Sequence, residues 1–396
     1  MPDSNARCIL VINAGSSSLK YALYQIHGTA LDLVQSGLMD GLTGTPRFVA
    51  KDAAGALLSS PTVDAKTLRG HDGAIDFLLD FLRAPLRAST LVAVGHRVVH
   101  GGMRYADPVR VTPAVVDDLE RLVPLAPLHQ PHNLAPIRIF ARREPSLPQV
   151  ACFDTAFHRT MPTLAQTFAL PREMSDAGVR RYGFHGLSYE FIAGRLREID
   201  AAAAAGRVVI AHLGNGASMC ATLAGKSVAT TMGMTALDGL VMGTRSGAID
   251  PGVLLYLQRE RGMDERALGD LLYQRSGLLG VSGVASDVRT LLASDDSHAR
   301  FAIDLFCYRA VCEIGALAAA MGGIDALVFT AGIGEHAADV RARIVAPLAW
   351  LGFACDAEAN ARHAQRIATP ASKPVYVIAT DEERMIAGHT RCIIGE

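Results

Sequence analysis

The chain lacks the motifs that identify the commonest nucleotide and metal proteins. Its 396 residues contain no Walker A pattern (GxxxxGK[ST]) and no GxGxxG dinucleotide fingerprint. The seven cysteines form no CxxC or other ligand spacing, so we expect reduced, mostly buried thiols in a cytoplasmic protein. The formal net charge is -1 and no long run carries one sign, so neither nucleic acid nor a membrane surface is expected as a partner.

Targeting segments and long apolar runs are also missing. Residues 1–7 are polar and the apolar run after them is short, so no signal peptide is expected. The most membrane-like window, residues 314–334, is interrupted by Gly322, Gly323 and Asp325. It therefore predicts a helix end followed by a buried strand. The composition, half of it hydrophobic, is ordinary for a soluble globular enzyme, and the length predicts two domains.

Two stretches share one pattern, an apolar run that ends in a polar glycine turn and continues into a second apolar run. They are residues 8–20 and residues 207–218, which align at Gly15 and Gly214. Glycines in such a turn let backbone N–H groups face outward, where they can hold phosphate oxygens. The two stretches are either ordinary hairpins or the two halves of a duplicated α/β fold whose turns face each other across a cleft.

Charged residues stand at other strand ends. Mg²⁺ takes one or two protein oxygens, so the strand-end carboxylates Asp154 and Glu382 are candidate ligands. Arg97 ends a strand, and Arg245 lies in the glycine-rich connection 230–250. The planar guanidinium group of each can donate two hydrogen bonds to carboxylate or phosphoryl oxygens. Taken singly, these residues are equally well explained as turn carboxylates and solvated arginines. Their shared position at strand-to-glycine junctions favours a site for phosphoryl transfer.

Seven motifs resemble those of the acetate kinase family and run in the family's order over nearly the whole chain. They are residues 11–20, 96–102, 153–158, 182–186, 212–216, 242–251 and 380–383. The resemblance implies an α/β fold in which duplicated ribonuclease-H-like, actin-like ATPase domains flank a nucleotide cleft. The expected domains are residues 1–153, to which 381–396 return, and residues 154–380, with a homodimer held by the second domain.

The resemblance also implies an activity, the reversible reaction of ATP with acetate to give ADP and acetyl phosphate by direct in-line transfer. The expected metal is Mg²⁺, with Mn²⁺ as a substitute, bound by Asn13 and Glu382. The implied catalytic residues are Asp154, His185 and Arg245, and the implied acetate-binding residues are Arg97, Val99, Leu128 and Phe184. The implied nucleotide-binding residues are Ser16, Ser18, Lys20, His212, Leu213, Gly214, Asn215, Gly216, Asp287, Val288, Arg289, Gly332, Ile333, Gly334, Glu335 and His336.

Three positions depart from the family's pattern. Ala236 stands where the family usually has proline in the pocket-lining segment, and we hypothesise that the enlarged pocket accepts propionate more readily than in typical members. His336 replaces the usual asparagine at the end of the third glycine turn, which affects the expected adenosine contact. Met103 replaces an acidic residue after His100-Gly101-Gly102.

Other functions remain as alternatives. A kinase for propionate or butyrate would share every motif and differ only in the pocket that receives the acid. A chaperone-like ATPase of the same fold would hydrolyse ATP without an acceptor acid and would not need Arg97 and Arg245. A non-catalytic nucleotide-binding protein is disfavoured because every catalytic position that the resemblance implies is filled.

Overall fold

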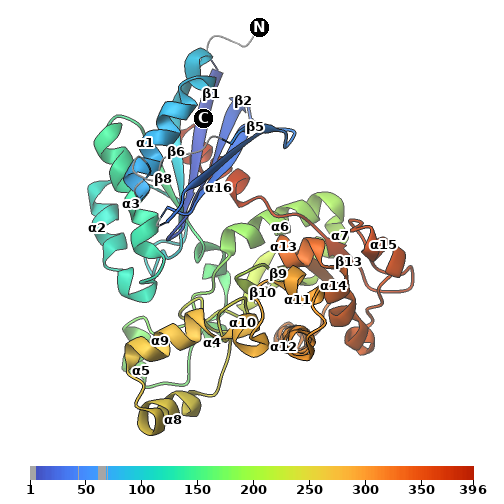
Figure 1. The fold of residues 1–396 in the computed structure, drawn as a ribbon. Coiled ribbons are helices and arrows are strands. Elements are labelled where there is room, and N and C mark those ends of the chain that lie inside the picture. Colours follow the sequence, from blue (N-terminus) through green and yellow to red (C-terminus); the bar gives the residue numbers. More distant parts are fainter. Residues whose placement is uncertain (1–5, 43, 61–67, 69) are drawn as a thin grey trace. The chain divides into compact units, whose positions relative to one another are not determined.

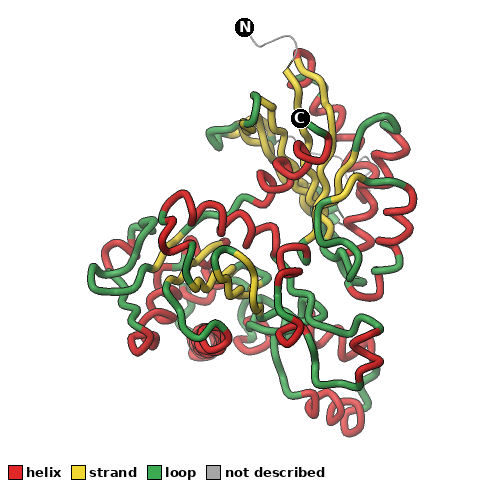
Figure 2. The backbone as a smooth tube through the Cα atoms, turned by 180° about the vertical axis from the view of Figure 1, so that it is seen from behind, coloured by secondary structure: helices red, strands yellow, loops and turns green. Residues whose placement is uncertain are grey.

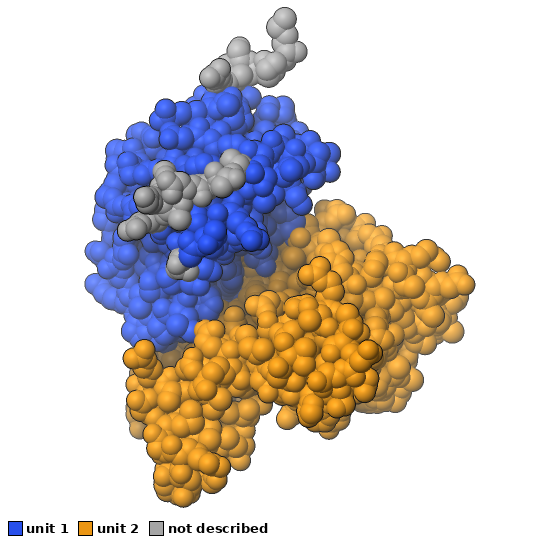
Figure 3. Space-filling view, in the orientation of Figure 1, with its two compact units in different colours: residues 1–156, 381–396 blue, residues 157–380 orange. Residues whose placement is uncertain are grey.

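The structure, a computed structural model, describes residues 6–42, 44–60, 68 and 70–396. The chain divides into two compact units, residues 1–156 with 381–396 and residues 157–380 (Figure 1 and Figure 3). Each unit contains its own β-sheet with helices packed against it, as the backbone coloured by secondary structure shows (Figure 2).

Unit 1 is built on an eight-stranded sheet in the order β5-β4-β3-β2-β1-β6-β8-β7. Strand β1 is antiparallel to β2 and parallel to β6, which in turn is parallel to β8. The strands are β1 (Ala6–Ala14), β2 (Leu19–His27), β3 (Ala30–Asp40), β4 (Arg47–Asp52), β5 (Leu57–Ser59), β6 (Ser89–Val98), β7 (Val109–Arg110) and β8 (Gln149–Phe153). The helices are α1 (Gly70–Leu82), α2 (Pro113–Glu120), α3 (Gln130–Arg143) and α16 (Glu382–Ile394).

The central strands of unit 1 are apolar along their length because helices cover both faces. Cys8, Leu10 and Ile12 of β1 belong to a core that includes residues of α1 and α3. Helix α16 packs against β1, β6 and β8 (Figure 1). A methyl group on Gly95 of β6 would lie 2.3 Å from Thr390 Oγ1 of α16, so glycine at this position allows the helix to approach closely.

Unit 2 is built on a five-stranded sheet in the order β11-β10-β9-β12-β13. Its strands are β9 (Arg207–Leu213), β10 (Ala217–Leu223), β11 (Lys226–Thr230), β12 (Ala326–Thr330) and β13 (Val375–Val377). Its helices are α4 (Thr163–Gln166), α5 (Arg172–Asp176), α6 (Gly186–Ile199), α7 (Ala201–Ala204), α8 (Pro251–Arg261), α9 (Glu265–Gln274), α10 (Gly277–Ser282), α11 (Val288–Leu292), α12 (Ser297–Ala320), α13 (Ala331–His336), α14 (Ala338–Val345) and α15 (Ala357–Ala361).

The two sheets repeat one topology. In unit 2, β9 is antiparallel to β10 and parallel to β12, as β1 is to β2 and β6 in unit 1. The order β3-β2-β1-β6-β8 therefore corresponds to β11-β10-β9-β12-β13. The duplicated α/β fold expected from the two glycine-turn stretches is confirmed.

The segment with the most membrane-like sequence consists of the end of α12 and the buried strand β12, as expected. In the part of the chain that the structure describes, no helix is long and apolar enough to cross a bilayer. Among the described residues the seven cysteines are thiols; Cys312 and Cys392 are exposed, Cys355 is half-buried and the other four are buried.

Candidate active site

The carboxyl ends of three parallel strands bring three of the expected site residues together in unit 1. Asn13 lies near the end of β1, Arg97 near the end of β6, and Asp154 directly after β8. Parallel strands end at the same edge of a sheet, and the pairing of Ile12 with His96 sets Asn13 beside Arg97. Sequence alone places these residues far apart, and the sheet makes them neighbours.

Arg97 is held by acids on several sides. Its Nε lies 3.1 Å from Asp154 Oδ1 and its Nη2 2.5 Å from Asp154 Oδ2, a two-pronged ion pair. Its Nη1 donates to Asn13 Oδ1 at 3.3 Å, and its Nε lies 3.9 Å from Glu382 Oε2. Burial by itself lowers the pKa of Arg97, but Asp154, Glu382 and Glu383 raise it overall, so the guanidinium remains charged.

Glu382 is the first residue of α16 and faces this cluster. Its pKa is raised to about 7, mainly by burial and also by Asp154 and Glu383, although Arg97 and Lys20 lower it. A carboxylate in such surroundings is stabilised by any added cation. Asn13 Oδ1 and Glu382 Oε2 both lie close to the Arg97 guanidinium, and two such oxygens are a donor set of the small size that Mg²⁺ accepts.

The described part of the chain contains no metal cage made entirely of protein ligands. Among the residues that the structure describes, no group of three His, Cys, Asp or Glu side chains is arranged to hold a metal ion. This observation does not bear on a two-ligand site in which water and substrate oxygens complete the shell.

The other three expected acetate-binding residues differ from one another in burial and in the unit that contains them. Val99 follows β6, is buried, and its backbone N–H donates to Asn133 Oδ1 at 2.9 Å. Leu128 lies in the loop before α3 with its side chain exposed, and Phe184 is buried in unit 2. Val99 is therefore held within the fold, whereas 44% of the Leu128 surface is exposed.

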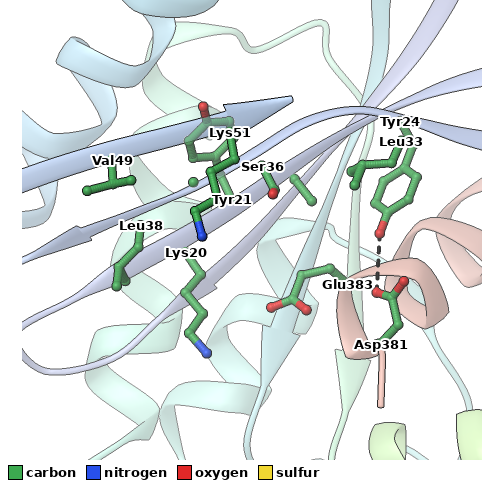
Figure 4. Close-up of a pocket in the computed structure, with 12 residues that line it drawn as sticks. Lys20, Tyr21, Tyr24, Leu33, Ser36, Leu38, Val49, Lys51, Asp381 and Glu383 are labelled. Carbon is green, nitrogen blue, oxygen red and sulfur yellow. Dashed lines mark hydrogen bonds between the residues drawn. The ribbon is translucent and has the colours of Figure 1, made fainter. Parts of the chain in front are cut away.

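The first glycine turn joins β1 to β2. Gly15 N–H donates to the Ser18 carbonyl at 2.8 Å, Ser16 is exposed, and Lys20 is paired with Asn13 across the two strands. Lys20 also lines a pocket of about 450 Å³ on the β2-β3-β4 face of the sheet. Figure 4 shows Lys20 and Glu383 at this pocket, with the Tyr24 hydroxyl donating to Asp381.

The second glycine turn joins β9 to β10 in unit 2, and two expected catalytic residues converge on it. A methyl group on Gly216 would lie 3.4 Å from His185 Nε2 and 3.7 Å from both terminal nitrogens of Arg245. The His185 ring stacks on the His212 ring with centroids 4.2 Å apart. Donors from a helix start, a strand end and a loop thus surround one turn, which suits a site that stabilises anionic oxygens.

Arg245 is positioned by the loop that contains it. The connection between β11 and α8 forms no helix or strand, as expected from its glycine content. Arg245 Nη1 donates to the Ala236 carbonyl at 2.8 Å, so the residue that replaces the family's proline orients this guanidinium through its backbone. Gly277, at φ 64°, approaches the Arg245 backbone so closely that a methyl group there would lie 2.7 Å from the Arg245 carbonyl.

The expected nucleotide contacts from three separate segments line one pocket of about 650 Å³ in unit 2, a volume typical of ligand sites. Its lining residues are Gly214, Asn215, Asp287, Val288, Arg289, Leu292, Ala293, Gly332, Ile333, His336 and Ala337. Asp287 caps α11 by accepting the Thr290 N–H, and this hydrogen bond lowers its pKa. Leu213 is buried in the sheet, Gly334 is buried, and Glu335 accepts the Thr380 N–H.

Some residues of the site were not found from the sequence. Asn133 is buried; its Nδ2 donates to the Ala14 carbonyl at 2.7 Å while its Oδ1 accepts the Val99 N–H, so it joins the ends of two strands. Glu383 lies 3.4 Å from Asn13 Nδ2. The position of Glu383 directly after Glu382 is a signal that could have identified it. Asn133 lies in a helical segment, where no feature of the sequence distinguishes it.

Comparisons with known proteins cover nearly the whole chain. A sequence model of the acetokinase family matches residues 8–388. A protein named acetate kinase from Rhodopseudomonas palustris (strain ATCC BAA-98 / CGA009) is 54% identical over 387 residues, which are 96% of this chain and 97% of that protein. Another acetate kinase, from Rhizobium meliloti, is 51% identical over 387 residues, 98% of each.

Two solved structures are similar to this chain in fold and in sequence. A propionate kinase from Francisella tularensis subsp. tularensis SCHU S4 has a TM-score of 0.91 and 37% identity, covering 98% of this chain and 100% of that one. The acetate kinase of Porphyromonas gingivalis has a TM-score of 0.87 and 37% identity, with the same coverage.

Proposed function

The chain belongs to the acetokinase family, and on that premise we propose that it transfers the γ-phosphate of ATP reversibly to acetate, giving ADP and acetyl phosphate. The observation that carries the proposal is the 54% identity to an acetate kinase over nearly the full length of both chains. The cluster around Arg97 in unit 1 and the residues that converge on Gly216 in unit 2 are what this chemistry requires.

In unit 1, Arg97 binds the carboxylate of the acid and Asp154 holds Arg97 in place. Asn13 and Glu382 are the residues that would hold Mg²⁺, or Mn²⁺ in its place, and the bound metal would neutralise phosphate charge. The acceptor carboxylate is already ionised at neutral pH, so no general base is needed. Asp154, in a two-pronged pair with Arg97, therefore has a positioning role.

In unit 2, the 650 Å³ pocket binds the nucleoside end of ATP and the turn 212–216 holds its phosphates. Ser16, Ser18 and Lys20 of the first turn are assigned to phosphate as well. An oxygen of acetate attacks the γ-phosphorus while the bond to the β–γ bridging oxygen breaks, and ADP leaves. His185 and Arg245 donate to the equatorial oxygens of the transferring group, where positioning and charge provide the rate enhancement.

A kinase for propionate is the second candidate, and two observations favour it. Ala236 stands where the family usually has proline, and one of the similar solved structures is a propionate kinase. A hydrophobic pocket discriminates one methylene by roughly 10- to 200-fold at most, so a modest change in the pocket decides between the two acids.

One assay separates these candidates. Acyl phosphate formation, trapped as the hydroxamate, is measured with acetate and propionate for the wild type and for Ala236→Pro. We expect acetate to be preferred by less than about 100-fold in kcat/KM, and the preference to increase in the variant. Hydrolysis of ATP without hydroxamate from either acid would disprove the kinase, and a preference for propionate would identify the second candidate.

We also propose that the protein is a cytoplasmic homodimer. No residue of α8 is buried, and large apolar side chains are exposed on α8 and α12: Val253, Leu255, Tyr256, Phe301 and Tyr308. An exposed apolar surface of this kind is typical of an interface. Sedimentation should show a dimer that Leu255→Asp converts to monomer; a wild type that sediments as a monomer would contradict the proposal.

The cytoplasmic location is supported by the cysteines. They are thiols, which suits a reducing compartment.

A further inference from the structure

His185 has one ring nitrogen at the proposed phosphate turn and the other in the protein interior. It precedes α6 with φ 57°, a left-handed conformation that is uncommon for a residue with a side chain. Its Nε2 is on the side of Gly216, as the 3.4 Å approach of a methyl group there indicates. Its Nδ1 lies 2.8 Å from Ser218 Oγ. The state of Nδ1 therefore determines what Nε2 offers a ligand.

The interior side continues as a chain of hydroxyl groups. Ser218 Oγ also lies 2.5 Å from the Tyr189 hydroxyl oxygen, and both residues have 0% of their surface exposed. Tyr189 is one turn after His185 on α6, and its backbone N–H donates to the His185 carbonyl. Ser218 is paired with His212 across β9 and β10. Helix α6 and the β9–β10 pair thus fix the positions of the His185, Ser218 and Tyr189 side chains in one row.

The protons in this row have one consistent arrangement. Burial raises the pKa of Tyr189 well above its ordinary value, so its hydroxyl keeps its hydrogen. In the part of the chain that the structure describes, the hydrogen-bond partner of this hydroxyl is Ser218 Oγ, and a buried O–H left without an acceptor is costly. Tyr189 therefore donates to Ser218, and Ser218 gives its own hydrogen to His185 Nδ1. A neutral imidazole that accepts at Nδ1 has its proton on Nε2.

We propose that Tyr189 and Ser218 are positioning residues, which hold His185 as the neutral tautomer whose Nε2–H donates to the transferring phosphoryl group. The catalytic half of this statement rests on the proposed function, whereas the tautomer does not. The opposite tautomer would turn a lone pair toward phosphoryl oxygens, and the transition state would lose a donor where its charge develops.

Kinetics test the catalytic half. Tyr189→Phe removes only the hydroxyl and should lower kcat roughly 3- to 10-fold, with KM for ATP and acetate changed less than about 2-fold. Ser218→Ala, which leaves Nδ1 without its donor, should lower kcat by more. Tyr376→Phe is a matched control in the same unit, because it deletes a buried hydroxyl that binds Asp200 at 2.6 Å instead of Ser218. It should leave kcat unchanged.

A double-mutant cycle separates positioning from a general structural role. If Tyr189 acts through His185, then Tyr189→Phe should change kcat by less than about 1.5-fold in a His185→Gln background. The same fractional loss of kcat in both backgrounds would overturn the proposal.

Nitrogen NMR tests the tautomer without any activity. The protein is labelled with ¹⁵N-histidine, and the His185 signals are identified by their absence in His185→Gln. At about pH 8, wild type should show the proton on Nε2 alone, and Tyr189→Phe should shift the pattern toward a mixture. A proton on Nδ1 in the wild type would overturn the proposal. An Nε2–H signal in a protein that forms no acyl phosphate would count against the proposed function alone.

Discussion

At the scale of single residues, Arg97 shows why a buried charge cluster is retained. A buried ion pair such as Arg97–Asp154 contributes little to stability, since both groups lose hydration. Asn13, Asp154 and Glu382 surround one guanidinium, which leaves the acids ready for added cations and the arginine ready for an added anion. This arrangement favours a role in binding metal and carboxylate over a role in stabilising the fold.

Arg245→Ala tests the second arginine. Arg245 lies beside Gly216 with His185 and is oriented by the Ala236 carbonyl. Contacts formed mainly in the transition state affect kcat more than KM, so we expect kcat to fall roughly 10²- to 10⁴-fold with a smaller change in KM. Steady-state kinetics of acyl phosphate formation measure both constants.

Arg245→Lys is the control for charge. Lysine keeps the positive charge but lacks the fork, so its kcat should lie between those of the wild type and the alanine variant. An unchanged kcat in Arg245→Ala would remove this residue from the mechanism.

At the scale of elements, α13 depends on a buried cation. Arg341 of α14 has 0% of its surface exposed, and its guanidinium donates to the carbonyls of Gly334 and Glu335 at the end of α13. It also donates to the Asn360 side chain and carbonyl and to His363 Nδ1. Gly332, Ile333 and His336 of the same short helix line the pocket proposed to bind the nucleotide, so Arg341 holds one wall of that pocket.

Arg341→Met keeps the volume of the side chain and removes the donors. Unpaired buried carbonyls cost about 1–3 kcal/mol each, so the melting temperature should fall and α13 should loosen. We expect KM for ATP to rise roughly 10-fold, with KM for acetate changed less than about 2-fold. Thermal unfolding and kinetics with each substrate varied provide the measurements.

Arg343→Met is the matched control, because Arg343 is on the same helix but its ion pairs with Asp304 and Asp339 are exposed. Exposed pairs contribute little, so both KM values and the melting temperature should stay close to those of the wild type. Equal effects of the two variants, or an equal rise of both KM values in Arg341→Met, would contradict the assigned role.

At the scale of the whole molecule, each unit contains a histidine that is buried without charge. His96 Nε2 in unit 1 donates to Gln149 Oε1, and His158 in unit 2 lies between Ser227 and the Phe184 carbonyl. Burial lowers the pKa of each to about 4. Because the unfolded chain binds protons near pH 6.5 and the folded protein does not, stability is present above that pH and falls as pH falls toward 4.

We therefore expect the urea midpoint to decrease between about pH 7.5 and about pH 5, with a loss of about 2 kcal/mol for each such histidine. His158→Gln should reduce this dependence on pH, and His27→Gln, at an exposed position, should not. A midpoint that stays constant over this range would show that these histidines do not promote acid unfolding.

The sequence by itself determined the parts of this protein that depend on short stretches of chain. Runs such as residues 8–14 and 207–213 have an apolar pattern typical of a buried strand, and the glycines after them permit the turns. Their repetition predicted the duplicated fold, and the motifs predicted the family. Local pattern suffices here because strand burial and turn geometry are settled within about ten residues.

Only the tertiary structure decided how residues distant in the chain combine. Asn13, Arg97 and Asp154 meet because three parallel strands end at one edge, and α16 adds Glu382 because Gly95 allows the helix to pack closely. Asn133, Arg341, Ser218 and Tyr189 have ordinary surroundings in the sequence. Their roles come from burial and hydrogen bonding across elements, which depend on three-dimensional packing and leave no periodic signal in the chain.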